Sequence, residues 1–293
     1  MKVHDGFVIS PDSRLIPFYR ISPFTTKAAA INRTLQATGA FGDYFNQRFP
    51  DYNWQFTLSG REALHLALKD IGLKRTDSVS ILTTTGNFYI SGCVTSEIEH
   101  FCSWDRQPDH QTSAILVNHE FGFPYEQLKN VGNYKLPVIE DCAHSFISQN
   151  REGIVGSVGD YLIFSLPKFF PIKLGGILCR RKSLGDLPKP GKSFEIQYIN
   201  NVMDHYIPDV VNFAIARKLN YRYFYGKFAE KGWFSRFEPE EYQTPGVFMF
   251  TLKEGEDGQG LKEHLQRNGV EASVFYKENA VFIPVHHMLT TDD

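Results

Sequence analysis

Two residues, Asp141 and Lys168, have the types and positions needed for covalent chemistry on a carbonyl compound. Each follows a short apolar run, 138–140 before Asp141 and 161–164 shortly before Lys168, and such runs are typical of buried strands. Ligands of open α/β sheets bind beyond the carboxyl ends of the strands. A carboxylate and an amine at one such edge suit pyridoxal 5'-phosphate (PLP), which needs a lysine for its Schiff base and an acid facing its pyridinium nitrogen.

A helix start earlier in the chain offers a place for a phosphate. Ser59 and Gly60 precede a segment that has apolar residues at helical spacing from Ala63 to Ile71. A glycine at the start of a helix leaves backbone N–H groups free at the positive end of the helix dipole, which favours a phosphate. An ordinary capped helix has the same pattern, so this motif alone leaves both interpretations open.

Several strings of the chain resemble the DegT/DnrJ/StrS family of PLP-dependent sugar aminotransferases, which have fold type I. They are PVIEDCAHSF at 137–146 and GSVGDYLIFS at 156–165, followed by Lys168 and by the glycine pair 175–176. The segment 58–72 resembles the family's phosphate turn and the helix behind it. The resemblance extends over nearly the whole chain and is most specific between the first of these strings and the glycine pair.

The resemblance implies a role for each matching residue near the cofactor ring. Lys168 would form the Schiff base and then move a proton as general base and acid, while Asp141 would keep the ring nitrogen protonated. His144 would lie against the ring. The family has a stacking aromatic at the position of Asn87 or Phe88. Phe88 is the candidate for stacking, although it fits equally well as a core residue of the following helix.

The resemblance also implies a phosphate site. Ser59 and Gly60 correspond to the family's phosphate turn, and Ser165 corresponds to a serine that donates to the phosphate. For Ser165 an ordinary hydroxyl in a turn remains an equal alternative. Arg61 replaces a small residue of the family, so it either adds a charge to the phosphate site or forms an ion pair elsewhere.

The segment between the serine and the lysine departs from the common family pattern. Fewer residues separate Ser165 from Lys168 than the family usually has, which makes Lys173 a rival for the reactive lysine. Lys168 keeps the family's spacing to the glycine pair 175–176. It also follows Pro167, whose fixed φ restrains the turn. We therefore assign the reactive amine to Lys168.

Strand and helix patterns alternate through the first half of the chain, which predicts an α/β fold with a mostly parallel sheet flanked by helices. Residues 1–185 are expected to form an N-terminal arm and a large PLP-binding domain. Residues 186–293 are expected to form a linker, a long helix over 213–231 and a small, abbreviated C-terminal α/β domain. Strands are predicted at 79–82, 98–104, 114–118, 138–140, 161–164, 247–252 and 270–275.

Composition excludes several classes of function. The chain has 293 residues, 42% of them hydrophobic, and a formal net charge of −2, which gives no electrostatic case for nucleic acid or an anionic membrane. No apolar run approaches the ~20 residues that span a bilayer, and the N-terminus lacks the apolar region of a secretory signal. The four cysteines are Cys93, Cys102, Cys142 and Cys179, and no two of them are spaced as C-x-x-C. We therefore expect reduced cysteines that pack as small hydrophobes, in a cytoplasmic protein.

We expect no metal site around the predicted cofactor. His119, Cys142 and His144 could join Asp141 on paper, but their spacing lacks the regularity of metal-binding motifs. The adjacent histidines 286 and 287 would point in opposite directions in a strand, so we expect surface or substrate-edge residues there.

Taken with the resemblance, these features predict an aminotransferase that moves an amino group from an amino acid such as glutamate to a keto sugar, which for the family is usually linked to a nucleotide. The family also implies a homodimer with a shared site, for which Asn200 and Asn201 are weak candidates. A dehydration catalysed by PLP is a further possibility. An alternative without enzymatic activity is a catalytically silent paralogue that acts as a binding or regulatory subunit. The short segment before the lysine, Arg61 in the phosphate turn and the abbreviated C-terminal domain suggest it.

Overall fold

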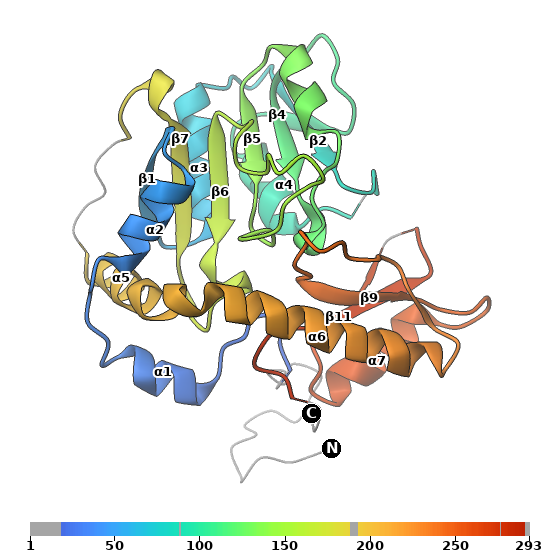
Figure 1. Cartoon of the computed structure of the whole chain (residues 1–293). Coiled ribbons are helices and arrows are strands. Elements are labelled where there is room, and N and C mark those ends of the chain that lie inside the picture. Colours follow the sequence, from blue (N-terminus) through green and yellow to red (C-terminus); the bar gives the residue numbers. More distant parts are fainter. Residues whose placement is uncertain (1–18, 88, 188–192, 276, 291–293) are drawn as a thin grey trace.

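The protein is described here by a computed structural model that covers residues 19–87, 89–187, 193–275 and 277–290. Its centre is a seven-stranded sheet (Figure 1). The strands are β1 (Tyr52–Thr57), β2 (Ser78–Thr83), β3 (Ser103–Asp105), β4 (Thr112–Asn118), β5 (Val138–Asp141), β6 (Tyr161–Ser165) and β7 (Gly176–Arg181). They lie in the order β1-β7-β6-β5-β4-β2-β3, and only β7 runs antiparallel to its neighbours. The predicted α/β fold with a mostly parallel sheet is confirmed.

Helices cover both faces of this sheet because its strands are apolar on both faces. In β6, Leu162 and Phe164 face a core shared with two helices, while Ile163 faces a second core shared with two others. The first pair is α2 (Ala40–Arg48) and α5 (Phe194–Tyr206), and the second is α3 (Gly60–Ile71) and α4 (Gly92–Glu99). A short helix, α1 (Thr26–Asn32), precedes them. The result is a three-layer α/β/α arrangement (Figure 1).

A second, antiparallel sheet of four strands has its own core. Its order is β10-β11-β9-β8, and the long helix α6 extends from the large sheet across to it (Figure 1). The elements are α6 (Val210–Ala229), β8 (Phe234–Ser235), β9 (Val247–Thr251), α7 (Gly258–Arg267), β10 (Ser273–Phe275) and β11 (Ala280–Pro284). A domain boundary after residue 185 stays a prediction, and α5, which follows it, packs on the core of the large sheet.

Short 3-10 helices complete the described elements: η1 (Glu120–Gly122), η2 (Leu128–Tyr134), η3 (Leu166–Lys168), η4 (Lys182–Leu184) and η5 (Ile207–Asp209). The first two lie between β4 and β5. Within the part of the chain that the structure covers, no helix is both long enough and apolar enough to cross a bilayer.

The predicted strand over 98–104 is wrong in its first half. Ile98 belongs to α4, and strand β3 begins only at Ser103. Val94 and Ile98, four residues apart, both point into the core between α4 and the sheet. This helical spacing continues past the expected boundary, so the helix ends later than the local composition suggested.

Two expectations about polar side chains also need correction. Cys102, Cys142 and Cys179 are buried and free, as expected, but Cys93 is exposed. His286 is buried at 6% exposure rather than lying on the surface. The stacking of His287 on Phe213, with ring centroids 3.8 Å apart, shows that packing from α6 covers this end of the chain.

A buried carboxylate joins α2 to α5. Asp204 is 2% exposed, and its two oxygens accept hydrogen bonds from the backbone N–H groups of Thr38, Gly39 and Phe41 at 2.7–2.9 Å. These groups lie at the start of α2, where N–H groups have no partner within the helix. Asp204 therefore caps α2 from a distant helix.

Asp204→Ala should lower the free energy of unfolding by about 1–3 kcal/mol, because it leaves the buried Phe41 N–H and the part-buried N–H groups of Thr38 and Gly39 without their charged acceptor. Urea denaturation followed by circular dichroism would measure the loss. Asp209→Ala is the control, since Asp209 is exposed on the neighbouring turn and should change stability by no more than about 0.5 kcal/mol. Equal effects of the two changes would contradict the capping role.

Candidate functional site

The carboxyl ends of the parallel strands meet at one edge of the large sheet. Asn118 ends β4 beside Asp141, which ends β5. A cavity of about 190 Å³ opens beyond this edge, between the large and the small sheet. Its walls include Lys168, His144 and Asn118 together with Ser273 of the small sheet. The location matches the one expected for the ligand of an open α/β sheet.

Asp141 is fixed at the floor of this edge. It is 7% exposed, and its two oxygens accept hydrogen bonds from the Ala143 backbone N–H at 3.0 Å and the Asn118 side-chain amide at 3.1 Å. Burial raises the pKa of Asp141, and the Ala143 N–H, His119, Asn118 and Lys168 only partly offset this effect. The carboxyl group is thus oriented and can share a proton with a basic group placed against it.

His144 lies close to Asp141 in the sequence and is enclosed by packing. The ring of Phe121 meets it edge-on, with centroids 5.3 Å apart. Burial, together with the charges of Lys168 and Arg217, lowers the pKa of His144 well below its usual value, so the ring is neutral. Its Nδ1 is buried and has no hydrogen-bond partner among the described residues. The structure therefore presents a neutral ring at the cavity wall.

Lys168 ends the 3-10 helix η3 that directly follows β6, and it lines the cavity. Its backbone carbonyl accepts a hydrogen bond of 2.9 Å from the guanidinium of Arg217 on α6. Arg217 is 1% exposed, also donates to the Pro245 carbonyl, and lies over the Phe169 ring at 4.7 Å. Burial lowers the pKa of Arg217 to about 9. Arg217 thus holds the lysine segment in place from a distant helix.

The rival lysine has a different environment. Lys173 is exposed, and its ammonium lies 4.9 Å from the centre of the Phe24 ring. It is not among the residues that line the cavity around Lys168. This placement favours Lys168 as the amine that can reach a ligand at the sheet edge.

The turn at the start of α3 touches the start of β7. A Cβ atom on Gly176 would lie 2.4 Å from the carbonyl carbon of Ser59 and 2.6 Å from the Gly60 nitrogen. A Cβ atom on Gly60 would lie 3.1 Å from that of Ser165. The structure thus brings Ser59, Gly60 and Ser165 together as predicted, and the glycine at 176 makes this close approach possible.

Ser59 also serves as an ordinary helix cap. Its hydroxyl accepts the Glu62 N–H at 3.1 Å, and the Glu62 carboxylate accepts the Leu58 N–H at 2.6 Å. The cap interpretation is confirmed, and the phosphate interpretation stays a prediction. The side chain of Ser59 satisfies a helix donor, and Gly60 lies close to Ser165.

Arg61 contacts the neighbouring helix. Its guanidinium donates to the sulfur of Cys93 at 2.7 Å, near the start of α4. Burial raises the pKa of Cys93, but hydrogen bonds from Arg61 and Ser91 and the charges of Arg61 and Lys168 outweigh it, so the pKa is lowered. Arg61 was expected either to add a charge to the phosphate site or to form an ion pair elsewhere. The structure shows a contact elsewhere, and its partner is a thiol rather than a carboxylate.

The predicted stacking residue, Phe88, lies outside the described residues. Its neighbour Tyr89 lines the cavity and lies within 5.8 Å of Phe121, measured between ring centroids. Asn87, the other candidate at this position, donates to Glu278, which lies between β10 and β11, at 3.1 Å.

Three residues of this site were missed in the sequence: Asn118, Glu120 and Arg217. Asn118 ends a strand whose register with β5 only the sheet reveals. Glu120 is 3% exposed at the cavity wall, and burial raises its pKa. The sequence did contain a signal for Arg217, because its spacing places it on the buried face of α6 with Val210, Ala214 and Tyr221.

The residues weighed for a metal near the cofactor do not gather as one group. His119 and Cys142 lie next to Glu140. The Glu140 oxygens accept hydrogen bonds from the backbone N–H groups of Gly156, Val158 and Gly159. Glu140 Oε2 also lies 3.2 Å from His119 Nε2. These contacts fix the loop between β5 and β6.

A larger cavity, of about 610 Å³, lies next to α3 and β1 and is lined by residues such as Phe56, Leu66 and Tyr161. It contains neither Lys168 nor Asp141 nor His144. We place the candidate site in the smaller cavity, because there the amine of Lys168 lies among polar groups at the ends of strands.

Part of the chain is similar in sequence to a known family. Residues 107–176 match the sequence model of the DegT/DnrJ/EryC1/StrS aminotransferase family. A GDP-perosamine synthase from Escherichia coli O157:H7 is 30% identical over 180 residues, which are 52% of this chain and 49% of that protein. The matched part thus spans about half the length of this relative.

Solved structures share the fold over nearly the full length. The aminotransferase TlmJ from Streptoalloteichus hindustanus superposes with a TM-score of 0.70 at 16% identity, covering 95% of each chain. A putative sugar aminotransferase, Spr1654 from Streptococcus pneumoniae in its PMP form, gives 0.68 at 17% identity, covering 94% of each chain. An E. coli GDP-4-keto-6-deoxy-D-mannose-3-dehydratase with bound hydrated PLP gives 0.68 at 16% identity, covering 93% of this chain and 96% of that one.

The chain has the fold of PLP-dependent transferases of fold type I. The segment that contains Asp141 and Lys168 matches the DegT/DnrJ/EryC1/StrS aminotransferase family, and the resemblance predicted from the sequence is confirmed.

Proposed function

We propose that the protein is a PLP-dependent aminotransferase that moves an amino group from an amino acid to a keto sugar linked to a nucleotide. One observation carries the proposal: Lys168 and His144 line one cavity at the sheet edge where Asp141 ends β5. The family match over residues 107–176 supports the reaction class. The relative at 30% identity is named GDP-perosamine synthase, which supports a nucleotide sugar as the acceptor.

The residues present fit PLP. The buried carboxyl of Asp141 suits the ring nitrogen, and the buried, unpartnered Nδ1 of His144 leaves a polar atom beside the ring's place. The crowded turn of Ser59, Gly60 and Gly176 suits a phosphate at the start of α3. When bound, PLP supplies an electron sink for negative charge at the carbon that bears the amino group.

The chain's own residues would divide the remaining work. Lys168 would hold the cofactor's aldehyde carbon and carry a proton to and from the substrate's α-carbon. Asp141 would orient and share the proton at the ring nitrogen, held in place by Ala143 and Asn118. His144 is neutral, so it would position the ring without adding a charge that competes with that proton. Arg217 would act as a positioning residue through the Lys168 carbonyl.

Spectroscopy of the PLP-loaded protein tests this function. Glutamate should replace the absorption band of the PLP form with that of the pyridoxamine form, and a nucleotide-linked keto sugar should restore the first band. If amino acids react and no sugar nucleotide of a broad panel does, the acceptor is wrong while the cofactor chemistry survives. An unchanged band with every amino acid would contradict the aminotransferase.

A second candidate, a silent paralogue with a binding or regulatory role, is favoured by one observation. Arg61 occupies the phosphate turn, yet its guanidinium donates to Cys93. Purified protein without a visible PLP band, and without uptake of added PLP, would favour this candidate over the enzyme.

We also propose a homodimer. Val211, Ile215 and Leu219, spaced four residues apart on α6, expose 51–58% of their surface and form an apolar stripe that a second copy could cover. The two weak candidates for a shared site have local partners: Asn201 donates to the Leu35 carbonyl at 3.0 Å, and Asn200 lies 3.5 Å from Asp204. Light scattering that shows a fully active monomer at micromolar concentration would contradict the dimer.

Arg217→Met should lower kcat by roughly 10–100-fold, because small misplacements of a reacting group cost this much and the Lys168 carbonyl loses its donor. Stability should fall little, since methionine fills much of the space and removes a buried charge. Arg222→Met, on an exposed position of the same helix, is the control. Equal rates for the two variants would contradict a positioning role.

A further inference from the structure

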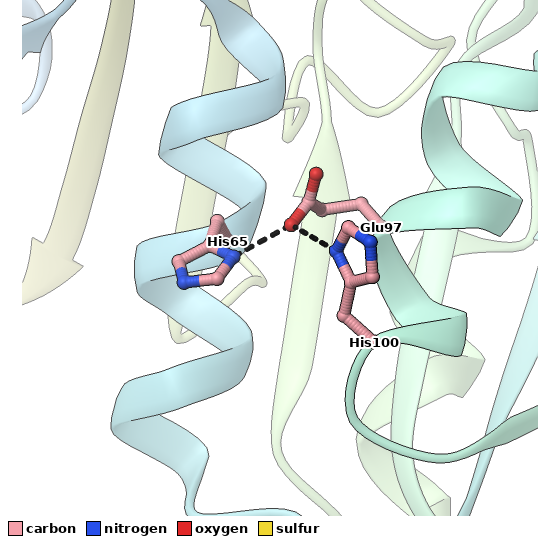
Figure 2. A group of neighbouring side chains, drawn as sticks. All are labelled: His65, Glu97 and His100. Atoms are coloured by element: carbon pink, nitrogen blue, oxygen red, sulfur yellow. Dashed lines mark hydrogen bonds and ion pairs between the residues drawn. The ribbon is translucent and has the colours of Figure 1, made fainter.

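A cluster of two histidines and one glutamate joins α3 to α4, outside the candidate site. His65 projects from the middle of α3, while Glu97 and His100 come from the C-terminal end of α4 (Figure 2). One oxygen of Glu97, Oε1, lies 2.6 Å from His65 Nδ1 and 3.2 Å from His100 Nδ1. Three potential ligand atoms thus converge on one point between two helices.

The donor set is one that divalent transition metals prefer. Two imidazole nitrogens and one carboxylate oxygen all lie within 4.8 Å of one another. Zinc binds such atoms at about 2.0–2.2 Å, so neighbouring ligands of a tetrahedral ion stand about 3.3 Å apart. His100 and Glu97 already have this spacing, and His65 would need to withdraw by less than about 1 Å.

Accessibility and charge also suit a metal. The side chains of His65 and His100 are 42% and 66% exposed, so an ion can enter and water can complete its coordination. Glu97 is held at 5% exposure. Its Oε1 lies within hydrogen-bond distance of both histidine rings. Phe101 packs on the His65 ring, with centroids 5.0 Å apart, and restricts its orientation.

We propose that His65, Glu97 and His100 bind one divalent transition-metal ion of the zinc class, with water in the fourth position. The ion would tie α3 to α4. Both helices start at the candidate active site, α3 at the Gly60 turn and α4 next to Ser91, which lines the cavity. Metal binding would therefore stabilise the two helix starts that shape this wall of the site.

The other cluster of possible ligands does not have these properties. His119, Glu140 and Cys142 are fully buried. Glu140 already accepts three backbone hydrogen bonds, and His119 Nδ1 accepts the Tyr125 N–H at 3.1 Å. An ion there would have no access to solvent and would have to break these bonds, so the cluster between α3 and α4 is the better site.

Calorimetric titration of tag-free, PLP-loaded protein with zinc chloride, after washing with a chelator, tests the proposal. We expect one zinc ion per chain and an increase of a few degrees in the thermal midpoint at saturating zinc. His100→Ala, at the most exposed ligand, should weaken binding at least tenfold, and so should His65→Ala and Glu97→Gln. His110→Ala changes an exposed histidine outside the cluster and should bind zinc as the unaltered protein does.

Cobalt gives a readout of geometry, because a tetrahedral Co²⁺ complex has intense visible bands that an octahedral aqueous ion lacks. These bands should appear in the unaltered protein and in the His110→Ala variant, and should be absent in His100→Ala. Absence of zinc binding would overturn the proposal and leave a hydrogen-bonded His–Glu–His contact between the helices. Binding that all three ligand variants retain would overturn it too, because the ion would then lie elsewhere.

Discussion

Lys168→Ala is expected to abolish turnover, lowering kcat by at least about 10³-fold, because the variant lacks both the amine that holds the cofactor and the group that moves the proton. The cavity position of Lys168 and the restraint from Arg217 on its backbone support this expectation. Borohydride reduction of the PLP-loaded protein, followed by peptide mass mapping, should place the pyridoxyl group on Lys168. The variant should still hold PLP without a covalent bond, through Asp141 and the phosphate turn.

Lys173→Ala is the matched control for this experiment. The ammonium of Lys173 lies over the Phe24 ring, and its side chain is exposed, so its loss should leave both labelling and turnover intact. Label on Lys173, or normal turnover by Lys168→Ala, would overturn the assignment. Absence of label on both lysines would favour the silent paralogue.

Gly176→Ala is expected to have the second-largest effect, a loss of PLP retention of at least about tenfold together with a destabilisation of roughly 2–4 kcal/mol. The added Cβ would lie 2.4 Å from the carbonyl carbon of Ser59 and 2.6 Å from the nitrogen of Gly60. Both are backbone atoms, which no side-chain rotation can move aside. The turn that is proposed to hold the phosphate would have to shift.

Graded variants separate this effect from a general loss of stability. Gly60→Ala brings its Cβ to 3.1 Å from the Cβ of Ser165, a milder contact, and should reduce PLP retention less than Gly176→Ala does. The added Cβ of Gly226→Ala on α6 would meet no atom of the described part of the chain within 4 Å, so this change should be neutral or stabilise the helix by about 0.5–1 kcal/mol. PLP content measured by absorbance and the thermal midpoint would give the ranking. Equal retention by all three variants would contradict the phosphate site.

The sequence alone determined the fold class and predicted that two candidate residues, Asp141 and Lys168, lie at one edge of the sheet. Short apolar runs before Asp141 and Lys168 predicted strands whose carboxyl ends would meet, and β5 and β6 are adjacent and parallel. This inference worked because parallel strands joined by crossovers present the same end to one edge of a sheet. Local patterns carried enough information, since strand periodicity and the position of a polar residue after the strand are properties of neighbouring residues.

Other local inferences failed where packing from distant segments decides the environment. The boundary between α4 and β3 was misplaced because Ile98 packs on the sheet as part of the helix. Cys93 was expected in a core, yet it lies exposed at the start of a helix beside Arg61. His286 was expected at the surface or at the edge of the substrate site, and it is buried where the chain end packs near α6, so it does not lie on the surface.

Only the tertiary structure revealed how the site is held together. Arg217 reaches the Lys168 carbonyl across 49 residues of sequence, and Gly176 lies against the Ser59–Gly60 turn from another strand. The convergence of His65 with Glu97 and His100 depends in the same way on how α3 packs against α4. The physical reason is common to all three: such contacts arise from the register of the sheet and the packing of helices on it, which no short segment encodes by itself.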